Sequence, residues 1–326
     1  MNFLSFSKSW ARLTLTLSLL VGLVACDGAS EITENSADQP ETISPRGYEK
    51  INAPNPSDPL NAHIFELSNG LKVYLTENHE EPRFYAEIAV RAGSKHDPAD
   101  GTGLAHYLEH LLFKGNRNLG TLDYAAEKPY LDEIVALYEE HFSETDEGRR
   151  AEIYSDINRV AQQAAVFAVP NEIDKLYNTM GGTALNAHTW YEETVYKIGL
   201  PSNRLHQWAE IESDRFVDPV FRLFHTELET VYEEKNRTLD NAGRIIGTAI
   251  DELLYKVHPY GQQPTIGTVD HLKNPSLVYI QNYFDTYYVP NNMGIFISGD
   301  IDVTETIELI SEKFGQWEPS PILEVG

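Results

Sequence analysis

The sequence predicts an α+β fold: a mostly antiparallel sheet packed by helices, with an inserted helical hairpin. Strand-like segments occur in runs and helical segments occur in runs, whereas strict alternation of the two would indicate a parallel sheet. The chain has 326 residues, enough for one large domain or two medium ones. Hydrophobic residues make up 41% and charged residues 23%, so we expect a globular protein with a substantial core.

The first 25 residues are predicted to be a signal peptide outside the fold. Lys8 and Arg12 supply positive charge ahead of an apolar run, LTLTLSLLVGLVA, at 13–25. A membrane-spanning helix needs about 20 predominantly apolar residues, so this run is too short to cross a bilayer. A cleaved targeting segment fits better.

Cys26 is the only cysteine of the chain, so no intramolecular disulfide can form. The stretch LVAC at 23–26 resembles the lipobox of bacterial lipoproteins, which implies a lipid anchor on Cys26. The alternative is an ordinary signal peptide followed by an incidental cysteine. We therefore expect a lipid-anchored protein on the periplasmic side of a bacterial cell envelope. Asp27, at the second position after the predicted cleavage, resembles the signal that retains lipoproteins in the inner membrane. If that signal does not apply, an anchor in the outer membrane is expected.

Residues 26–60 are rich in Ser, Pro, Glu and Asn and lack apolar periodicity, which predicts a flexible tether. The net charge of the chain is −25; the segment 1–25 holds Lys8 and Arg12 and no acidic residue, so the part after it carries −27. This charge opposes binding to phosphate backbones and anionic lipid surfaces, so no nucleic-acid partner is expected. It predicts a preference for neutral or basic peptides if peptides bind.

The folded domain is predicted to span 61–326 and to begin with strands. Residues 63–78 alternate apolar and polar side chains around Asn69-Gly70, a strong hairpin signal. Residues 83–94 repeat the strand pattern. After a loop rich in Gly and Asp, a helix is expected from Leu104 to Lys114, with its leucines facing a core.

Residues 126–180 are predicted to be helical throughout and to form the inserted hairpin, with a turn at 143–149. Its two apolar stripes are interpreted as packing surface. Ser202 is expected to cap the helix that follows the next strand region. The remaining predicted elements are strand character at 183–200, helices at 202–216, 222–239, 243–257 and 275–287, a buried strand at 292–301 and a final helix at 304–316.

The stretch GLAHYLEHLLFKG at 103–115 places three proton-handling side chains at the head of an apolar run. At 3.6 residues per turn, His106, Glu109 and His110 share one face of a helix. Two imidazoles at this spacing can converge on one zinc ion, and H-x-x-E-H is the inverted form of the H-E-x-x-H zinc protease helix. The alternative is an ordinary amphipathic helix with half-buried histidines.

A catalytic zinc site usually takes three protein ligands and keeps one position for water, so a third ligand is needed. The helix at 222–239 offers several glutamates. Glu227 and Glu234 share the face of Val231, because seven residues return a helix to within about 20°. Glu229 and Glu233 point elsewhere. From the residues alone, a solvated acidic face is the better interpretation for any one of these glutamates.

The segment from about 60 to 318 resembles the M16 metalloendopeptidases, the family of pitrilysin, insulinase and mitochondrial processing peptidase. The resemblance depends on five stretches in the family's order, and their combination is far more specific than H-x-x-E-H alone. These stretches are RAGSKHDPADGTGLAHYLEHLLFKGN (91–116), LNAHTWYEETVY (185–196), ELETVYEEKNR (227–237), HPYG (258–261) and YFDTYYVPNNMGIFISGDID (283–302).

The resemblance implies that His106, His110 and Glu234 bind Zn²⁺ and that Glu109 is the general base. It also implies that Glu227 orients the neighbouring groups. Asn186 and Ala187 would lie on the strand to which a peptide substrate adds its backbone. Two departures stand out: the long gap between His110 and Glu234, which the insertion explains, and an end after one domain where family enzymes carry a further homologous domain.

The expected function is zinc-dependent hydrolysis of peptides or small unfolded proteins. One alternative is an incomplete or non-hydrolytic zinc-binding subunit that needs a homologous C-terminal half or a partner subunit. Another is a structural lipoprotein whose zinc serves folding alone, in which case chelation would unfold the domain.

Overall fold

The structure is a computed structural model that describes residues 47–53, 55 and 57–321. The predicted signal peptide, Cys26 and most of the predicted tether lie outside the described residues, and those predictions are unchanged. Among the described residues, no helix has both the length and the apolar composition that crossing a bilayer requires.

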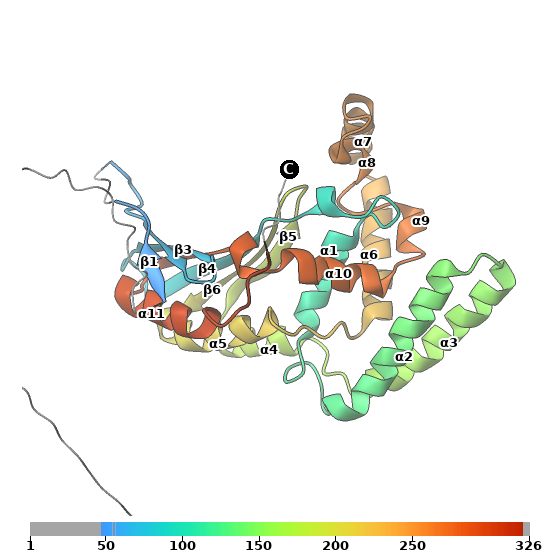
Figure 1. The fold of residues 1–326 in the computed structure, drawn as a ribbon, viewed down its shortest axis with the longest axis horizontal. Coiled ribbons are helices and arrows are strands. Elements are labelled where there is room, and N and C mark those ends of the chain that lie inside the picture. The colour runs from blue at the N-terminus through green and yellow to red at the C-terminus, as the bar shows by residue number, and fades with distance from the viewer. Residues whose placement is uncertain (1–46, 54, 56, 322–326) are drawn as a thin grey trace, which may run out of the picture. The chain divides into compact units, whose positions relative to one another are not determined.

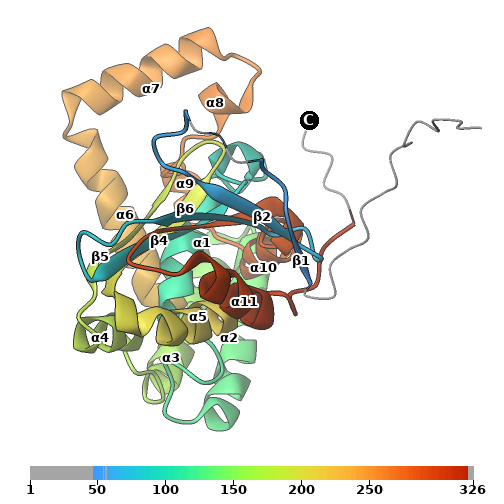
Figure 2. The same cartoon turned by 90° about the vertical axis from the view of Figure 1, so that its left-hand side faces the viewer.

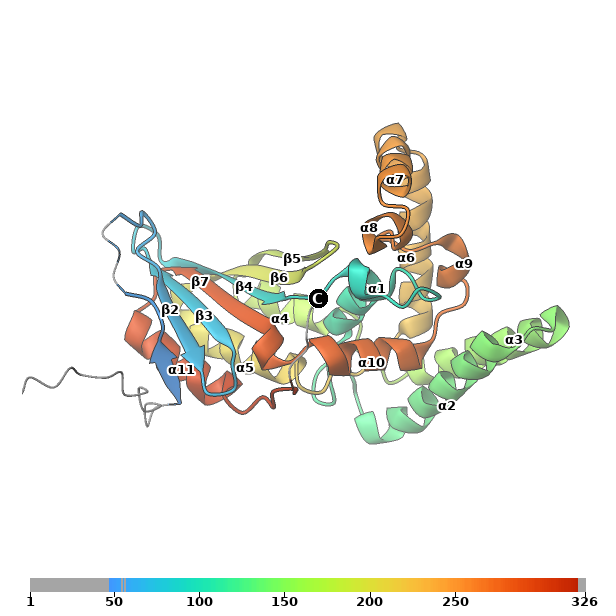
Figure 3. The ribbon, with the colours of Figure 1, turned by 45° about the horizontal axis from the view of Figure 1, so that its top comes forward.

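Seven strands of the described part form one sheet in the order β1-β2-β3-β7-β4-β6-β5 (Figure 3). Every neighbouring pair is antiparallel except β3 and β7, which are parallel. The predicted, mostly antiparallel sheet is therefore confirmed. The strands are β1 (Tyr48–Lys50), β2 (His63–Leu67), β3 (Lys72–Glu77), β4 (Arg83–Val90), β5 (Thr183–Thr189), β6 (Thr194–Pro201) and β7 (Met293–Gly299).

The predicted hairpin around Asn69-Gly70 joins β2 to β3, and Gly70 adopts a φ of +85° that favours glycine. The Asn69 amide is buried and donates to the backbone oxygens of Phe314 and Trp317, 2.9 and 3.1 Å away. These two bonds fix the turn to residues 314–317. The Asn-Gly signal predicts the turn but not this long-range contact.

One strand prediction is confirmed and refined, and the tether prediction needs correction. The strand character at 183–200 belongs to two antiparallel strands, β5 and β6, with the Thr189–Thr194 pair next to the turn. In addition, β1 lies inside the segment predicted as a tether and pairs with β2. Three residues are too few to show a period, so composition alone decided the tether prediction.

The described part of the chain contains eleven α-helices, which are labelled in Figure 1. They are α1 (Leu104–Leu111), α2 (Tyr124–Ser143), α3 (Glu147–Ala165), α4 (Glu172–Thr179), α5 (Leu205–Arg215), α6 (Phe224–Leu239), α7 (Ala242–Leu254), α8 (Pro259–Gln262), α9 (Val269–Leu272), α10 (Leu277–Tyr287) and α11 (Val303–Phe314).

The sheet is covered by helices on one face. Along β3, Val73 and Leu75 point into the core, whereas Tyr74 lies on the other face and stacks on Phe296 of β7 at 4.4 Å between ring centroids. Helices α5 and α11 run beneath the sheet, and α1 packs at the end formed by β5 and β6 (Figure 1). The candidate site thus lies on a helix fixed to a rigid support.

The inserted hairpin consists of α2 and α3, whose N-termini are capped by Asp123 and Asp146. The prediction of one helical hairpin over 126–180 is wrong after residue 165, because α4 is a separate helix that packs against β5. The predicted cap at Ser202 is also wrong. Its hydroxyl donates to Asp300 at 2.6 Å and makes no helix-capping hydrogen bond.

Candidate metal centre

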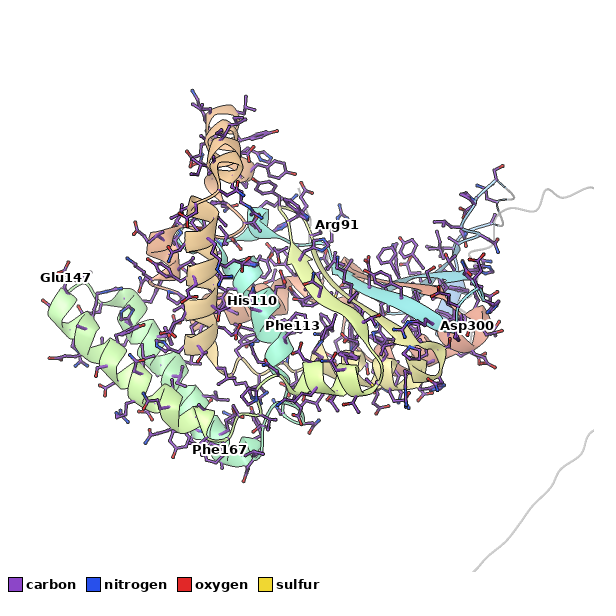
Figure 4. All side chains as sticks on the ribbon, turned by 180° about the vertical axis from the view of Figure 1, so that it is seen from behind. Arg91, His110, Phe113, Glu147, Phe167 and Asp300 are labelled. Atoms are coloured by element: carbon purple, nitrogen blue, oxygen red, sulfur yellow. The ribbon has the colours of Figure 1, made fainter. Side chains whose placement is uncertain are left out.

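Helix α1 brings His106 and His110 together, as their spacing predicts. Their ring centroids are 4.9 Å apart and the rings meet at 86°. Figure 4 shows His110 on α1, between α6 and the β5–β6 hairpin, and α1 contacts both. The histidine pair is therefore flanked by the two elements on which the other predicted site residues lie.

Helix α6 supplies the third group, Glu234. Its Oε2 lies 3.7 Å from Nε2 of His106 and 3.7 Å from Nε2 of His110. The three potential ligand atoms all lie within 4.8 Å of one another. Ligands held at about 2.0–2.2 Å from one zinc ion have separations of this order, so the three side chains fit such an ion.

The chemistry of His106 also fits a metal. Burial lowers the pKa of His106 to about 3, and the neighbouring His110 contributes a smaller part of this shift. The imidazole of His106 is therefore neutral. Neutral imidazole is the form that binds metals. In the described part of the chain, the buried Nδ1 of His106 has no hydrogen-bond partner. A proton on that nitrogen leaves the Nε2 lone pair free for an ion.

Glu227 contacts His110 on the opposite side of the ring from Glu234. Its Oε2 lies 3.3 Å from Nδ1 of His110, and its Oε1 lies 2.6 Å from Nζ of Lys114. Burial raises the pKa of Glu227, but its bonds to His110 and Lys114 outweigh burial and leave the pKa below its usual value. An ionised Glu227 thus holds the His110 ring. Sequence analysis missed Lys114, although its position four residues after His110 places it on the same face.

The other two glutamates of the acidic helix lie away from the histidines, as their helical positions predict. The carboxylate of Glu229 lies 4.0 Å from Nε2 of His225, and that of Glu233 lies 3.9 Å from Nη2 of Arg237. All four residues belong to α6, so both glutamates pair within their own helix. Both side chains are largely exposed. Substitutions of Glu229 and Glu233 can therefore serve as controls for a substitution of Glu234.

Glu109 lies beside the histidine pair and is only 7% exposed. Its Oε2 accepts a hydrogen bond of 2.6 Å from the hydroxyl of Thr189, the last residue of β5. Burial raises the pKa of Glu109, and the bond from Thr189 partly opposes this. A carboxylate with a raised pKa is a better proton acceptor. Sequence analysis missed Thr189, since no periodicity links it to Glu109.

A buried carboxylate fixes the start of α1. Asp97 accepts hydrogen bonds from the backbone N–H groups of Gly103 and Ala105, at 2.7 and 2.9 Å. Burial raises the pKa of Asp97 to about 8, against the opposing effect of these bonds. Gly103 has a φ of +87°, and a Cβ there would lie 2.8 Å from the Cα of Gly267. Glycine is therefore needed where the loop enters the helix.

Asn186 and Ala187 lie on β5, which is the last strand of the sheet on this side. They pair with Lys197 and Tyr196 of β6, so the other edge of β5 has no strand partner in the described part. Asn186 is exposed and Ala187 is partly exposed. Such an edge can accept an added strand.

Comparison with known families gives two matches. Residues 72–128 match the family described as "Insulinase (Peptidase family M16)", and residues 278–325 match "Peptidase M16 inactive domain". The first match contains His106, Glu109 and His110. Glu227 and Glu234 fall between the two matches, so their placement depends on the geometry above.

Several curated relatives are named as zinc proteases. The chain is 26% identical over 271 residues to "Probable zinc protease PqqL" of Haemophilus influenzae, covering 81% of this chain and 24% of that protein. It is 24% identical over 257 residues to "Zinc protease PqqE" of Helicobacter pylori, covering 76% and 45%. The chain thus spans about a quarter to a half of the length of these relatives.

Solved structures share the fold. The first half of the periplasmic protease PqqL from Escherichia coli has a TM-score of 0.60 at 21% identity, over 83% of this chain and 49% of that one. Pitrilysin has a TM-score of 0.62 at 18% identity, over 86% and 26%. The predicted resemblance is confirmed: the chain is similar to peptidase family M16 in sequence and in fold.

Proposed function

We propose that the chain carries the zinc site of a metalloendopeptidase that hydrolyses peptides or small unfolded proteins. The observation that carries the proposal is the convergence of His106, His110 and Glu234 within 4.8 Å of one another, with Glu109 on the same helical face. The zinc proteases named among the relatives support the metal and the reaction class.

In this proposal His106, His110 and Glu234 hold Zn²⁺. When bound at such a site, the ion supplies Lewis-acid polarisation of an amide carbonyl and lowers the pKa of water towards about 7. Glu109 accepts the proton of the attacking water and delivers it to the leaving amine. Glu227 orients His110 through its Nδ1, and Lys114 holds Glu227 in place through the other carboxylate oxygen.

The substrate backbone would add to the free edge of β5 at Asn186 and Ala187. Backbone hydrogen bonds along an edge strand give affinity without demanding a particular sequence. The scissile amide would then lie near Thr189, where β5 ends beside Glu109. This arrangement favours extended, unfolded chains over compact substrates.

A homologous second half is the proposed partner, because the chain aligns with 45% of PqqE and with 49% of the structure of the first half of PqqL. It would close over the metal centre. The periplasmic assignment of the PqqL structure supports a periplasmic site of action, and Cys26 remains the proposed lipid anchor.

Zinc binding tests the ligand set directly. Purified chain is expected to bind about one zinc ion, and Glu234→Gln is expected to weaken zinc affinity at least about 100-fold, more than typical losses from groups that only orient a ligand. The measurement is metal content together with a competition titration against a chelator. Glu233→Gln is the matched control, since it removes the adjacent exposed charge and should leave zinc affinity unchanged. Equal affinity of the two variants would remove Glu234 from the site.

A further inference from the structure

The last residue of β5 is positioned to control the general base. We propose that Thr189 is a positioning residue that holds one oxygen of Glu109 and leaves the other oxygen free to accept the proton. The inference rests on the proposed function, because it gives Thr189 a role in that same reaction.

The contact is short and shielded from water. The Thr189 hydroxyl lies 2.6 Å from Oε2 of Glu109, and the two residues are 8% and 7% exposed. Hydrogen bonds to an ionised acceptor are shorter and stronger than neutral ones. Among the described residues, no other side chain donates a hydrogen bond to Glu109. The Oε1 atom is thus left for the reaction.

The backbone that carries Thr189 is fixed against the approach to α1. Just after β5, the carbonyl of Trp190 accepts from the N–H of Ser94 at 3.0 Å, and that of Tyr191 accepts from Lys95 at 2.9 Å. A Cβ on Gly93 would lie 2.1 Å from the Trp190 oxygen, so this approach requires glycine. The end of β5 is therefore fixed to residues 93–95, and Asp97, two residues later, binds the backbone at the start of α1.

This anchoring links substrate position to the base. The strand proposed to hold the peptide backbone ends in the residue that orients Glu109. A carboxylate held by a threonine loses rotational freedom, because the β-branched side chain has few χ1 rotamers. Strand β5 then positions both the proton acceptor and the scissile amide. Fixing two reacting groups relative to one another raises kcat.

Kinetics of three variants test the inference in the zinc-loaded chain, with the second half of a relative supplied if turnover requires it. Thr189→Val keeps the shape and removes the hydroxyl, and should lower kcat at least tenfold with little change in KM. Thr189→Ser should restore most of kcat. Thr194→Val is the matched control: Thr194 pairs with Thr189 across β5 and β6, but its hydroxyl donates to the backbone oxygen of Ala92. Its kcat should stay within about threefold of wild type.

A second measurement needs no turnover. In metal-free chain, the unfolding effects of Thr189→Val and Glu109→Met should be non-additive, whereas those of Thr194→Val and Glu109→Met should add. Additive effects in the first pair, or an unchanged kcat in Thr189→Val, would overturn the inference. If instead Glu109→Gln retained full turnover, the proposed function itself would fail, so the two failures are distinguishable.

Discussion

Glu109→Gln is expected to abolish nearly all peptide hydrolysis while leaving zinc binding intact. Glutamine has the same shape and can still accept a hydrogen bond from Thr189, but it cannot take a proton from water. General-base catalysis typically contributes about 10²- to 10⁴-fold, so kcat should fall by that order. The measurements are steady-state hydrolysis of an unfolded peptide and zinc content of the same sample.

The control for this variant is Glu193→Gln. Glu193 is exposed at the turn between β5 and β6 and approaches His188 at 3.4 Å, so its loss removes one nearby charge without touching Glu109. Its kcat should change little. A Glu109→Gln variant that cleaves peptide as fast as Glu193→Gln would show that Glu109 is not the base.

Helical periodicity predicted which glutamates of α6 share a face, but it could not assign their roles. Glu227 and Glu234 lie two turns apart, about 10 Å along the axis. In the structure they reach opposite nitrogens of His110, Glu227 at Nδ1 and Glu234 at Nε2. That distinction depends on how α6 crosses α1, which is a tertiary property that no local spacing records.

Thr189 and Lys114 show two further limits of the sequence. The contact of Lys114 with the site could have been predicted, because Lys114 follows His110 by four residues and therefore lies on the same helical face. Thr189 reaches Glu109 across 80 residues of chain because β5 folds back beside α1. The turn between β5 and β6 carries none of the Gly, Asn or Pro signals that mark most hairpins, so 183–200 was predicted as one strand region.

Helix α7 shows what an apolar stripe can and cannot predict. The pattern at 243–257 correctly predicts a helix, but every side chain of α7 is at least partly exposed. Figure 2 shows α7 extending from the end of α6, beyond the sheet. Periodicity therefore fixes the type of element, whereas burial depends on neighbours that the pattern does not specify.

The inserted hairpin is fixed to the loop after α1 by one buried arginine. Arg222 and Glu127 of α2 are 1% and 0% exposed, and Arg222 Nε lies 3.1 Å from Glu127 Oε1. The same guanidinium donates to three backbone oxygens of the loop after α1. These are Lys114 and Leu119 at 2.8 Å each and Asn116 at 2.7 Å. Its Nη2 also donates to Glu127 Oε2 at 3.3 Å, so all five N–H donors of the arginine are used.

Arg222→Met is expected to lower the free energy of unfolding by about 3–5 kcal/mol, because it leaves the Glu127 charge and three backbone oxygens buried without a partner. Arg222→Lys should recover little, since an ammonium cannot reproduce the planar fork. Denaturant unfolding monitored by circular dichroism measures both. Arg117→Met is the control: its ion pair with Asp218 is exposed, and such pairs contribute about 0–1 kcal/mol. A loss below about 1 kcal/mol for Arg222→Met would mean that this loop and the hairpin are stabilised independently of the arginine.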